Sequence, residues 1–243
     1  MFTLDTRIAQ FINSFAHRWW TLDAFVCFLA SNHLFKGVLV MAVFCFLWFQ
    51  ASNAASVFQR TEKRGILLYS LLICIPGLFS ARWLAGVLPF RQRPLFSPSL
   101  HMIRAYGFDS DALEPWSSFP SDHAVLFFAL ATGVWLVNKK AGLFLYVYTI
   151  ACIALPRIFL GIHYPTDLLA GALLGIALGY SAKFHAMRSV VARSASRLQK
   201  LSPGLFYACW FFLVCQTAVL YGPLRGGVQV AREILHTWLK GVQ

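Results

Sequence analysis

The sequence predicts an all-α protein, a polytopic membrane helix bundle of about six spans. Composition is the first reason: 58% of the 243 residues are hydrophobic and only 12% are charged, whereas soluble domains usually carry about a quarter charged residues. Long charge-free runs are the second reason, because crossing a bilayer takes roughly 20 mainly apolar residues. These runs are also apolar on every side, which disfavours a soluble helical core with one polar face.

Six charge-free runs define the expected spans. They cover residues 37–59, 65–81, 124–138, 141–156, 168–182 and 205–224. The shorter runs need their flanking residues to reach across the membrane. We find no internal repeat, so we interpret residues 1–243 as a single membrane domain that ends in a C-terminal tail, residues 222–243.

Residues 1–33 are predicted to form an N-terminal interfacial segment. Residues 2–15 place Leu4, Ile8 and Phe11 at helical spacing between polar side chains, a pattern typical of a helix lying in the membrane surface. Residues 24–31 are apolar but too short to cross unaided.

Basic residues set the expected orientation. They gather in three connecting segments, 60–64, 139–140 and 183–200, which we interpret as cytoplasmic loops because Lys and Arg accumulate on that side. The segments 88–120 and 161–167 then lie on the outer side, where Asp109, Asp111 and Glu114 offset part of the basic charge. The net charge of +12 thus indicates orientation and contact with membrane lipids. We do not expect nucleic-acid binding, because no soluble basic domain is present.

The outer segments hold an unusual group of polar residues at the ends of the expected spans. Ionisable side chains at such positions are costly unless they are paired or functional. The group comprises Arg82, Arg93, Ser121, Asp122, His123, Arg157, His163 and Asp167.

These residue types suit phosphoryl transfer. An Arg side chain matches phosphate oxygens and stays charged at any working pH. Backbone amides around Ser121 and Asp122, at a helix start, form a natural anion site. A neutral His attacks phosphorus when another group orients it, and Asp167 follows His163 by four residues, a spacing that suits this role. A second, protonated His can give the leaving group its proton. We see no His, Cys, Asp or Glu set that suggests a metal, and we expect no cofactor.

In these motifs the chain resembles the type-2 phosphatidic acid phosphatase superfamily of membrane lipid phosphatases. That family pattern is a Lys and an Arg-Pro six residues apart, then Pro-Ser-Gly-His, then Ser-Arg, five residues, His, three residues and Asp. The matching positions are Arg93-Pro94, Pro120-Ser121-Asp122-His123, and Arg157 with His163 and Asp167. They define a catalytic motif region over residues 82–167.

The resemblance implies a role for each matched residue. His163 is the expected nucleophile, Asp167 its orienting partner, and His123 the general acid that later activates water. Arg93 and Arg157 are the expected phosphate clamps, assisted by Ser121.

Three positions depart from the family pattern. Asp122 replaces the Gly, and we expect its amide to face the phosphate while its side chain turns away. Pro156 replaces the Ser before Arg157, and Gly86 occupies the Lys position. Arg82 and Arg91 are the two candidates to replace that Lys. We favour Arg82, because 11 residues, about three helical turns, separate it from Arg93.

The resulting prediction is a membrane phosphatase that hydrolyses a lipid phosphate or diphosphate through a phosphohistidine. Undecaprenyl diphosphate is our best guess for the substrate. The expected location is a bacterial inner (plasma) membrane, with the active site facing the periplasm or exterior. Two alternatives stay open at this point: a lipid phosphotransferase with an acceptor such as lipid A, and a catalytically inactive transporter or scaffold.

Overall fold

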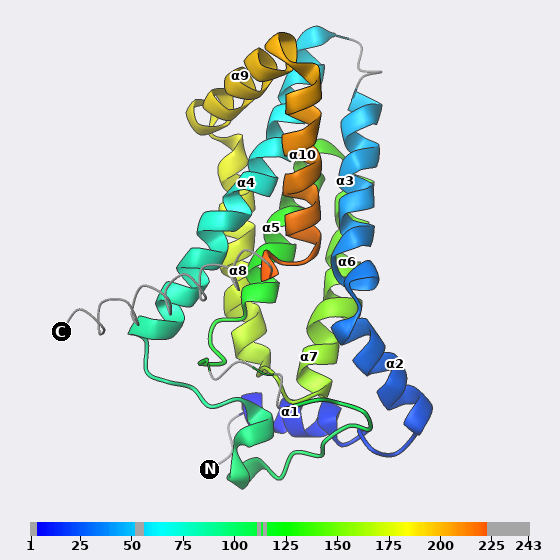
Figure 1. The fold of residues 1–243 in the computed structure, drawn as a ribbon. Helices are drawn as coiled ribbons and strands as arrows, with labels where there is room; N and C mark the ends of the chain where they lie inside the picture. The colour runs from blue at the N-terminus through cyan, green and yellow to red at the C-terminus, as the bar shows by residue number, and fades with distance from the viewer. Residues whose placement is uncertain (1–3, 52–55, 111–112, 114–115, 223–243) are drawn as a thin grey trace, which may run out of the picture.

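The computed structural model describes residues 4–51, 56–110, 113 and 116–222. Over these residues the chain is a bundle of helices and contains no strand (Figure 1). The prediction of an all-α fold is therefore confirmed. The bundle is built from η1 Leu34–Val38 with α3 Leu39–Gln50, α4 Val57–Val87, α5 Asp122–Val137, α6 Lys139–Tyr148 continuing through η5 Thr149–Ala154 into α7 Leu155–Phe159, α8 Pro165–Tyr180 with η6 Ser181–Lys183, and α10 Pro203–Ala218.

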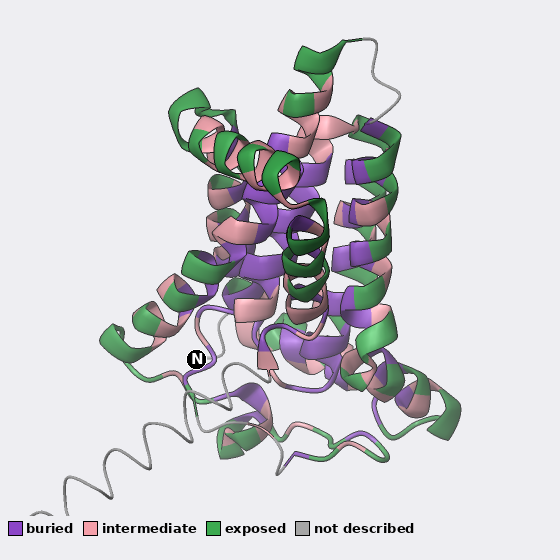
Figure 2. Cartoon of the chain, turned by 45° about the horizontal axis from the view of Figure 1, so that its top comes forward, coloured by how far each residue is buried: buried purple, intermediate pink, exposed green. Residues whose placement is uncertain are grey.

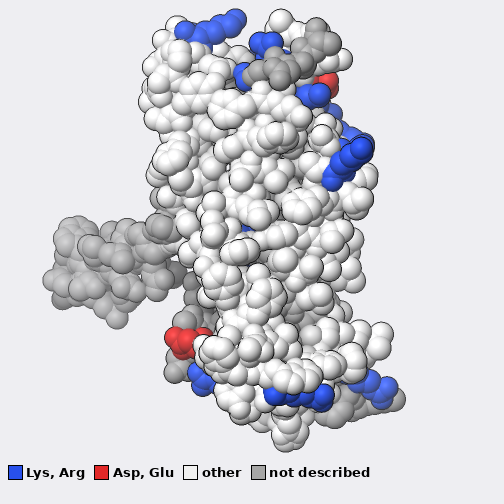
Figure 3. Space-filling view, turned by 90° about the vertical axis from the view of Figure 1, so that its right-hand side faces the viewer, with Lys and Arg blue, Asp and Glu red and all other residues white. Residues whose placement is uncertain are grey.

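Several helices are long and apolar enough to cross a membrane. Among the described residues three pass this test, 57–87, 139–159 and 165–183. A fourth crossing results if α2 (Trp20–Ser31) and the segment Leu34–Gln50, which meet at a 63° bend, count as one. Helices α5 and α10 are apolar but have only 16 residues each. Figure 3 shows charged side chains near the two ends of the face in view and an almost uncharged band between them. The count of six spans stays a prediction.

Two expected loops are helical. Residues 60–64 lie on the first turns of α4, which begins at Val57, so the expected span 37–59 is broken in two. Residues 183–200 largely form helix α9, His185–Leu201. In both places charge density indicated a loop, but Arg, Lys and Glu are good helix formers. The start of α4, the start of α6 and α9 lie at one end of the bundle (Figure 1). Of the predicted C-terminal tail, residues 223–243 lie outside the described part, as do Asp111 and Glu114.

Helix α5 lies at the centre of the bundle (Figure 2). Every residue from Ala124 to Val134 is buried, since this helix carries no charged side chain after its first turn and packs against α4, α6 and α8. The closest packing is with α8, where glycines recur every four residues. A Cβ added at Gly171 would lie 2.5 Å from the Ser121 carbonyl oxygen, and one at Gly175 would lie 2.3 Å from that of Val125. Such small residues let two helix backbones touch.

Helix α1, Leu4–Asn13, lies across the other end of the bundle from α9. Asn13 fastens it there, because its Nδ2 donates to the carbonyls of Ile103 and Phe159 at 2.8 and 2.7 Å. Its Oδ1 also accepts from the Ile103 amide at 2.6 Å. Leu4 and Phe11 remain exposed, as the amphipathic pattern leads us to expect for a helix at the membrane surface. The interfacial placement of residues 1–33 stays a prediction.

The α5–α8 contact can be tested with Gly175→Ala. The new methyl group has no room against the backbone of α5, so we expect a loss of about 1–3 kcal/mol in stability and a lower unfolding temperature in detergent. Gly204→Ala is the control, because a Cβ there meets no atom within 4 Å. Equal unfolding temperatures for the two variants would contradict this packing.

Candidate active site

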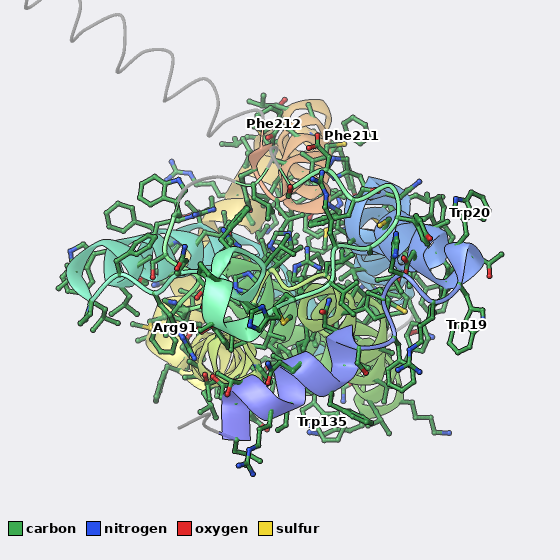
Figure 4. All side chains as sticks on the ribbon, turned by 90° about the horizontal axis from the view of Figure 1, so that it is seen from below. Trp19, Trp20, Arg91, Trp135, Phe211 and Phe212 are labelled. Carbon is green, nitrogen blue, oxygen red and sulfur yellow. The ribbon has the colours of Figure 1, made fainter. Side chains whose placement is uncertain are left out.

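Backbone hydrogen bonds join the three motif segments at one end of the bundle. The Ser118 amide donates to the Arg91 carbonyl at 2.9 Å, and the Ser121 amide donates to the Asp167 carbonyl at 3.1 Å. The Leu95 amide donates to the carbonyl of Gly161 at 2.9 Å. These bonds join residues as far apart in sequence as Leu95 and Gly161, and they hold the segments together at the start of α5 and the turn before α8, the end that Figure 4 views from below.

His163 lies in the turn between α7 and α8 and is 4% exposed. Its Nδ1 is 2.8 Å from the Ser118 carbonyl oxygen. A carbonyl only accepts, so Nδ1 carries the proton and Nε2 keeps its lone pair. Burial lowers the pKa of His163, while Asp167 acts in the opposite direction. The ring is therefore neutral near pH 7, the state that a nucleophile needs.

Asp167 does not make the closest contact with His163. The sequence predicts that it holds the ring nitrogen, but its Oδ2 is 3.6 Å from Nδ1, beyond hydrogen-bond distance, and the Ser118 carbonyl occupies that position instead. Asp167 Oδ2 accepts from the Tyr164 amide at 2.8 Å, and its Oδ1 accepts from Arg91 at 2.6 Å. The carboxylate therefore caps α8 and stabilises the turn that carries His163.

Arg91 links three parts of the chain (Figure 4). Besides Asp167, it donates to Thr166 Oγ1 at 2.8 Å and to Asp5 Oδ2 at 2.5 Å. Its guanidinium carbon also lies 4.0 Å from the centre of the Tyr164 ring. Asp5 is in α1 and further accepts from the Thr166 amide at 2.9 Å. Sequence reasoning missed Asp5 because its partners Arg91 and Thr166 lie 86 and 161 residues away. Of the two candidates for the family Lys, Arg91 is thus engaged with two carboxylates.

Asp122 lies between Arg82 and His123. Its Oδ2 accepts from Arg82 at 2.8 Å, and its Oδ1 is 2.8 Å from the His123 amide nitrogen and 3.0 Å from His123 Nδ1. The carboxylate therefore has a cation and a ring nitrogen within reach, and the expectation that this side chain turns away from the phosphate stays a prediction. The contact with Nδ1 leaves His123 Nε2 as the ring atom that can face a substrate.

Three of the backbone amides at the start of α5, those of Ser121, His123 and Ala124, donate to acceptors within the chain. The Ser121 amide bonds to the Asp167 carbonyl, and the His123 amide bonds to the Asp122 carboxylate. The Ala124 amide donates to Ser121 Oγ at 3.5 Å. An Asp in the first turn satisfies the helix start from within the chain. The Ser121 hydroxyl proton remains available, because Oγ acts only as an acceptor in this contact.

Two arginines of the motifs are buried beside these histidines. Arg157, in α7, is 3% exposed and donates to the Ile153 carbonyl at 2.8 Å. Arg93 is 9% exposed and donates to the Ile162 carbonyl, next to His163, at 3.3 Å. Within the described part of the chain, no carboxylate lies within ion-pair distance of Arg157. A buried cation of this kind is costly until an anion arrives, so the pair is suited to holding phosphate oxygens.

Across the described residues, no three His, Cys, Asp or Glu side chains come together as a metal site would require. The expectation of chemistry without a metal or cofactor stays a prediction.

Comparison with known proteins gives a consistent result. The family model of the PAP2 superfamily matches residues 65–189, more than half of the chain. Undecaprenyl-diphosphatase BcrC of Bacillus subtilis (strain 168) is 24% identical over 177 residues, 73% of this chain and 81% of that protein. Bacitracin transport permease protein BcrC of Bacillus licheniformis is 27% identical over 168 residues, 69% and 73% of the two chains.

A solved structure also matches. The crystal structure of Aquifex aeolicus LpxE aligns with a TM-score of 0.53 and 25% identity, covering 74% of this chain and 95% of that chain. The helical bundle, the joined motifs and the family match agree. The chain therefore belongs to the PAP2 superfamily, and it is a lipid phosphatase.

Proposed function

We propose that the enzyme hydrolyses a polyprenyl diphosphate, with undecaprenyl diphosphate as the best candidate, through a phosphohistidine on His163. The observation that carries the proposal is the state of His163. It is neutral, its Nδ1 is held by the Ser118 carbonyl at 2.8 Å, and its Nε2 lone pair is free to attack beside two buried arginines.

The proposed reaction has two steps. In the first, His163 Nε2 forms a bond to the terminal phosphorus while the bond to the bridging oxygen breaks, and His123 donates its proton to that oxygen. In the second, His123 takes a proton from water, whose oxygen attacks phosphorus and releases His163 and inorganic phosphate. Arg93 and Arg157 hold the phosphate oxygens throughout, with the Ser121 hydroxyl as a further donor.

An apolar surface beside the site favours a lipid substrate. Trp83 on α4 is 59% exposed and Trp116 is 44% exposed. The guanidinium carbon of Arg82 lies 5.5 Å from the Trp116 ring centre, so this surface borders the Asp122–His123 pair. A lipid chain resting on these rings keeps its headgroup at the level of His163. The B. subtilis relative is named an undecaprenyl-diphosphatase, which supports a polyprenyl diphosphate as the substrate.

Replacing the nucleophile tests the mechanism. His163→Ala should reduce phosphate release from undecaprenyl diphosphate by on the order of 10³-fold or more, measured on purified protein in detergent with EDTA. His185→Ala is the control, because His185 is exposed at the start of α9, at the far end of the bundle. Near wild-type turnover by His163→Ala would refute the phosphohistidine.

The same assay separates hydrolysis from transfer and tests the need for a metal. Free phosphate released without an added lipid acceptor supports the phosphatase over a phosphotransferase.

Loss of activity in EDTA that magnesium restores would contradict metal-free chemistry.

The pH profile reports the state of His163. The nucleophile must be neutral, so activity falls as pH drops through its pKa. Burial holds that pKa below the ordinary 6.5, so the acid limb of kcat/KM should lie below pH 6.5. Asp167→Asn removes a group that raises this pKa, and should move the limb to lower pH while reducing the rate. Ionisation of the free substrate is the same in both assays, so a difference between the two pH profiles comes from the enzyme. A limb that moves to higher pH would contradict this assignment.

Cysteine labelling tests the proposed orientation, in which the site faces the periplasm or exterior. Ser99 is exposed near the site, and Ser194 is exposed on α9 at the far end. In a cysteine-free parent, Ser99→Cys should react with a membrane-impermeant maleimide in intact spheroplasts, and Ser194→Cys only after lysis. The reverse pattern would place the site on the cytoplasmic side.

A further inference from the structure

Lys36 is a buried cation outside the family motifs. It lies on the π-helix η1, at the 63° bend between α2 and α3, and is only 8% exposed. Its position precedes the family-matched residues 65–189 by a whole helix. Single π turns in helical proteins often occur at functional sites, and the segment η5, which leads into the helix of Arg157, is the other π-helix among the described elements.

No acidic partner explains the burial of Lys36. Within the described residues, its ammonium group makes no hydrogen bond, and no carboxylate lies within ion-pair distance. A lysine charge inside an apolar bundle is costly unless an anion neutralises it. The side chain therefore indicates a binding site for an anion that the described residues do not supply.

The packing of η1 brings the segment of Lys36 close to that of Arg157, because η1 contacts η5, which leads into α7. The hydroxyl of Tyr148 donates to the Phe35 carbonyl, which joins η1 to the end of α6. Gly37 lies against Ala218 of α10, where a Cβ would come within 1.9 Å of the carbonyl oxygen. The charge of Lys36 interacts with those of Arg157 and Asp122, and it also acts on His123. Lys36 therefore lies within electrostatic range of two motif segments, the one with Asp122 and His123 and the one with Arg157.

The cations predicted from the motif spacing are engaged elsewhere. Gly86 occupies the family Lys position and has open space around it. Arg82 is paired with Asp122 at 2.8 Å, and Arg91 is paired with Asp5 and Asp167. Each of these ion pairs neutralises a positive charge that would otherwise attract the phosphate.

We propose that Lys36 is a phosphate-binding residue of this active site and supplies, from η1, the cation that the family pattern places at position 86. The proposal rests on the proposed function, because it assigns Lys36 to the same phosphate as Arg93 and Arg157. The ammonium group donates to a phosphate oxygen and neutralises part of its charge.

The test compares Lys36→Met with wild type. Methionine fills a similar volume without charge, so we expect KM for undecaprenyl diphosphate to rise about 10- to 100-fold, as loss of a charge-assisted hydrogen bond implies. The concentration of vanadate, a phosphate mimic, needed for half-maximal stabilisation against heat should rise by a similar factor. Lys36→Arg should stay within a few-fold of wild type. Lys140→Met is the matched control and should change neither value, because Lys140 is exposed in the first turn of α6, at the end of the bundle away from the site.

The two readouts separate failure of this inference from failure of the proposed function. An unchanged KM and unchanged vanadate stabilisation in Lys36→Met would overturn the role of Lys36, even with full turnover. If wild type binds vanadate but releases no phosphate from the lipid, the proposed function fails, and the vanadate comparison still decides whether Lys36 binds phosphate. If Lys36→Met does not fold, Lys36→Gln and Lys36→Arg carry the comparison. Equal vanadate affinity in those two would overturn the proposal.

Discussion

The close contact of α5 and α8 is the constraint on which the site depends. Gly171 and Gly175 let the two backbones touch, because any Cβ there would collide with a carbonyl oxygen of α5. Only at that separation does the Ser121 amide reach the Asp167 carbonyl at 3.1 Å. That hydrogen bond places the start of α5, with His123, beside the turn with His163. Helix packing thus helps to set the relative position of the two histidines, together with the Ser118 carbonyl that holds His163 in its turn.

Charge is the second constraint, because the site concentrates cations among apolar walls. The Asp122–Arg82 pair and the Arg91 contacts with Asp5 and Asp167 neutralise part of that charge within the chain. Arg157, beside them, has no carboxylate within ion-pair distance among the described residues. In the proposed mechanism the substrate phosphate is that anion, and donors that are already in place need no rearrangement as charge develops on its oxygens. Substrate binding would then offset the free-energy cost of burying the cations.

Sequence reasoning anticipated the helical bundle and the residues of the motifs, since both follow from local patterns of apolarity and spacing. It could not anticipate the Ser118 carbonyl at His163, because every residue has a backbone carbonyl and the sequence does not show which one accepts the bond. Asp5 was also out of reach, as its contact with Thr166 spans 161 residues. The charge density of residues 183–200 predicts a loop, but the same charged side chains suit the exposed helix α9 that forms there.

Two departures from the family pattern, Asp122 and the missing Lys at position 86, are physically linked through Arg82. An Asp at position 122 adds a negative charge beside a phosphate site, which by itself would repel the substrate. Arg82 binds that carboxylate at 2.8 Å, so the pair is close to neutral, and Asp122 keeps its second oxygen for His123. The arginine therefore compensates the aspartate more directly than it replaces the family lysine. In the proposed site the remaining positive charge comes from elsewhere in the fold. The bend at η1 buries Lys36, which has no carboxylate within ion-pair distance among the described residues.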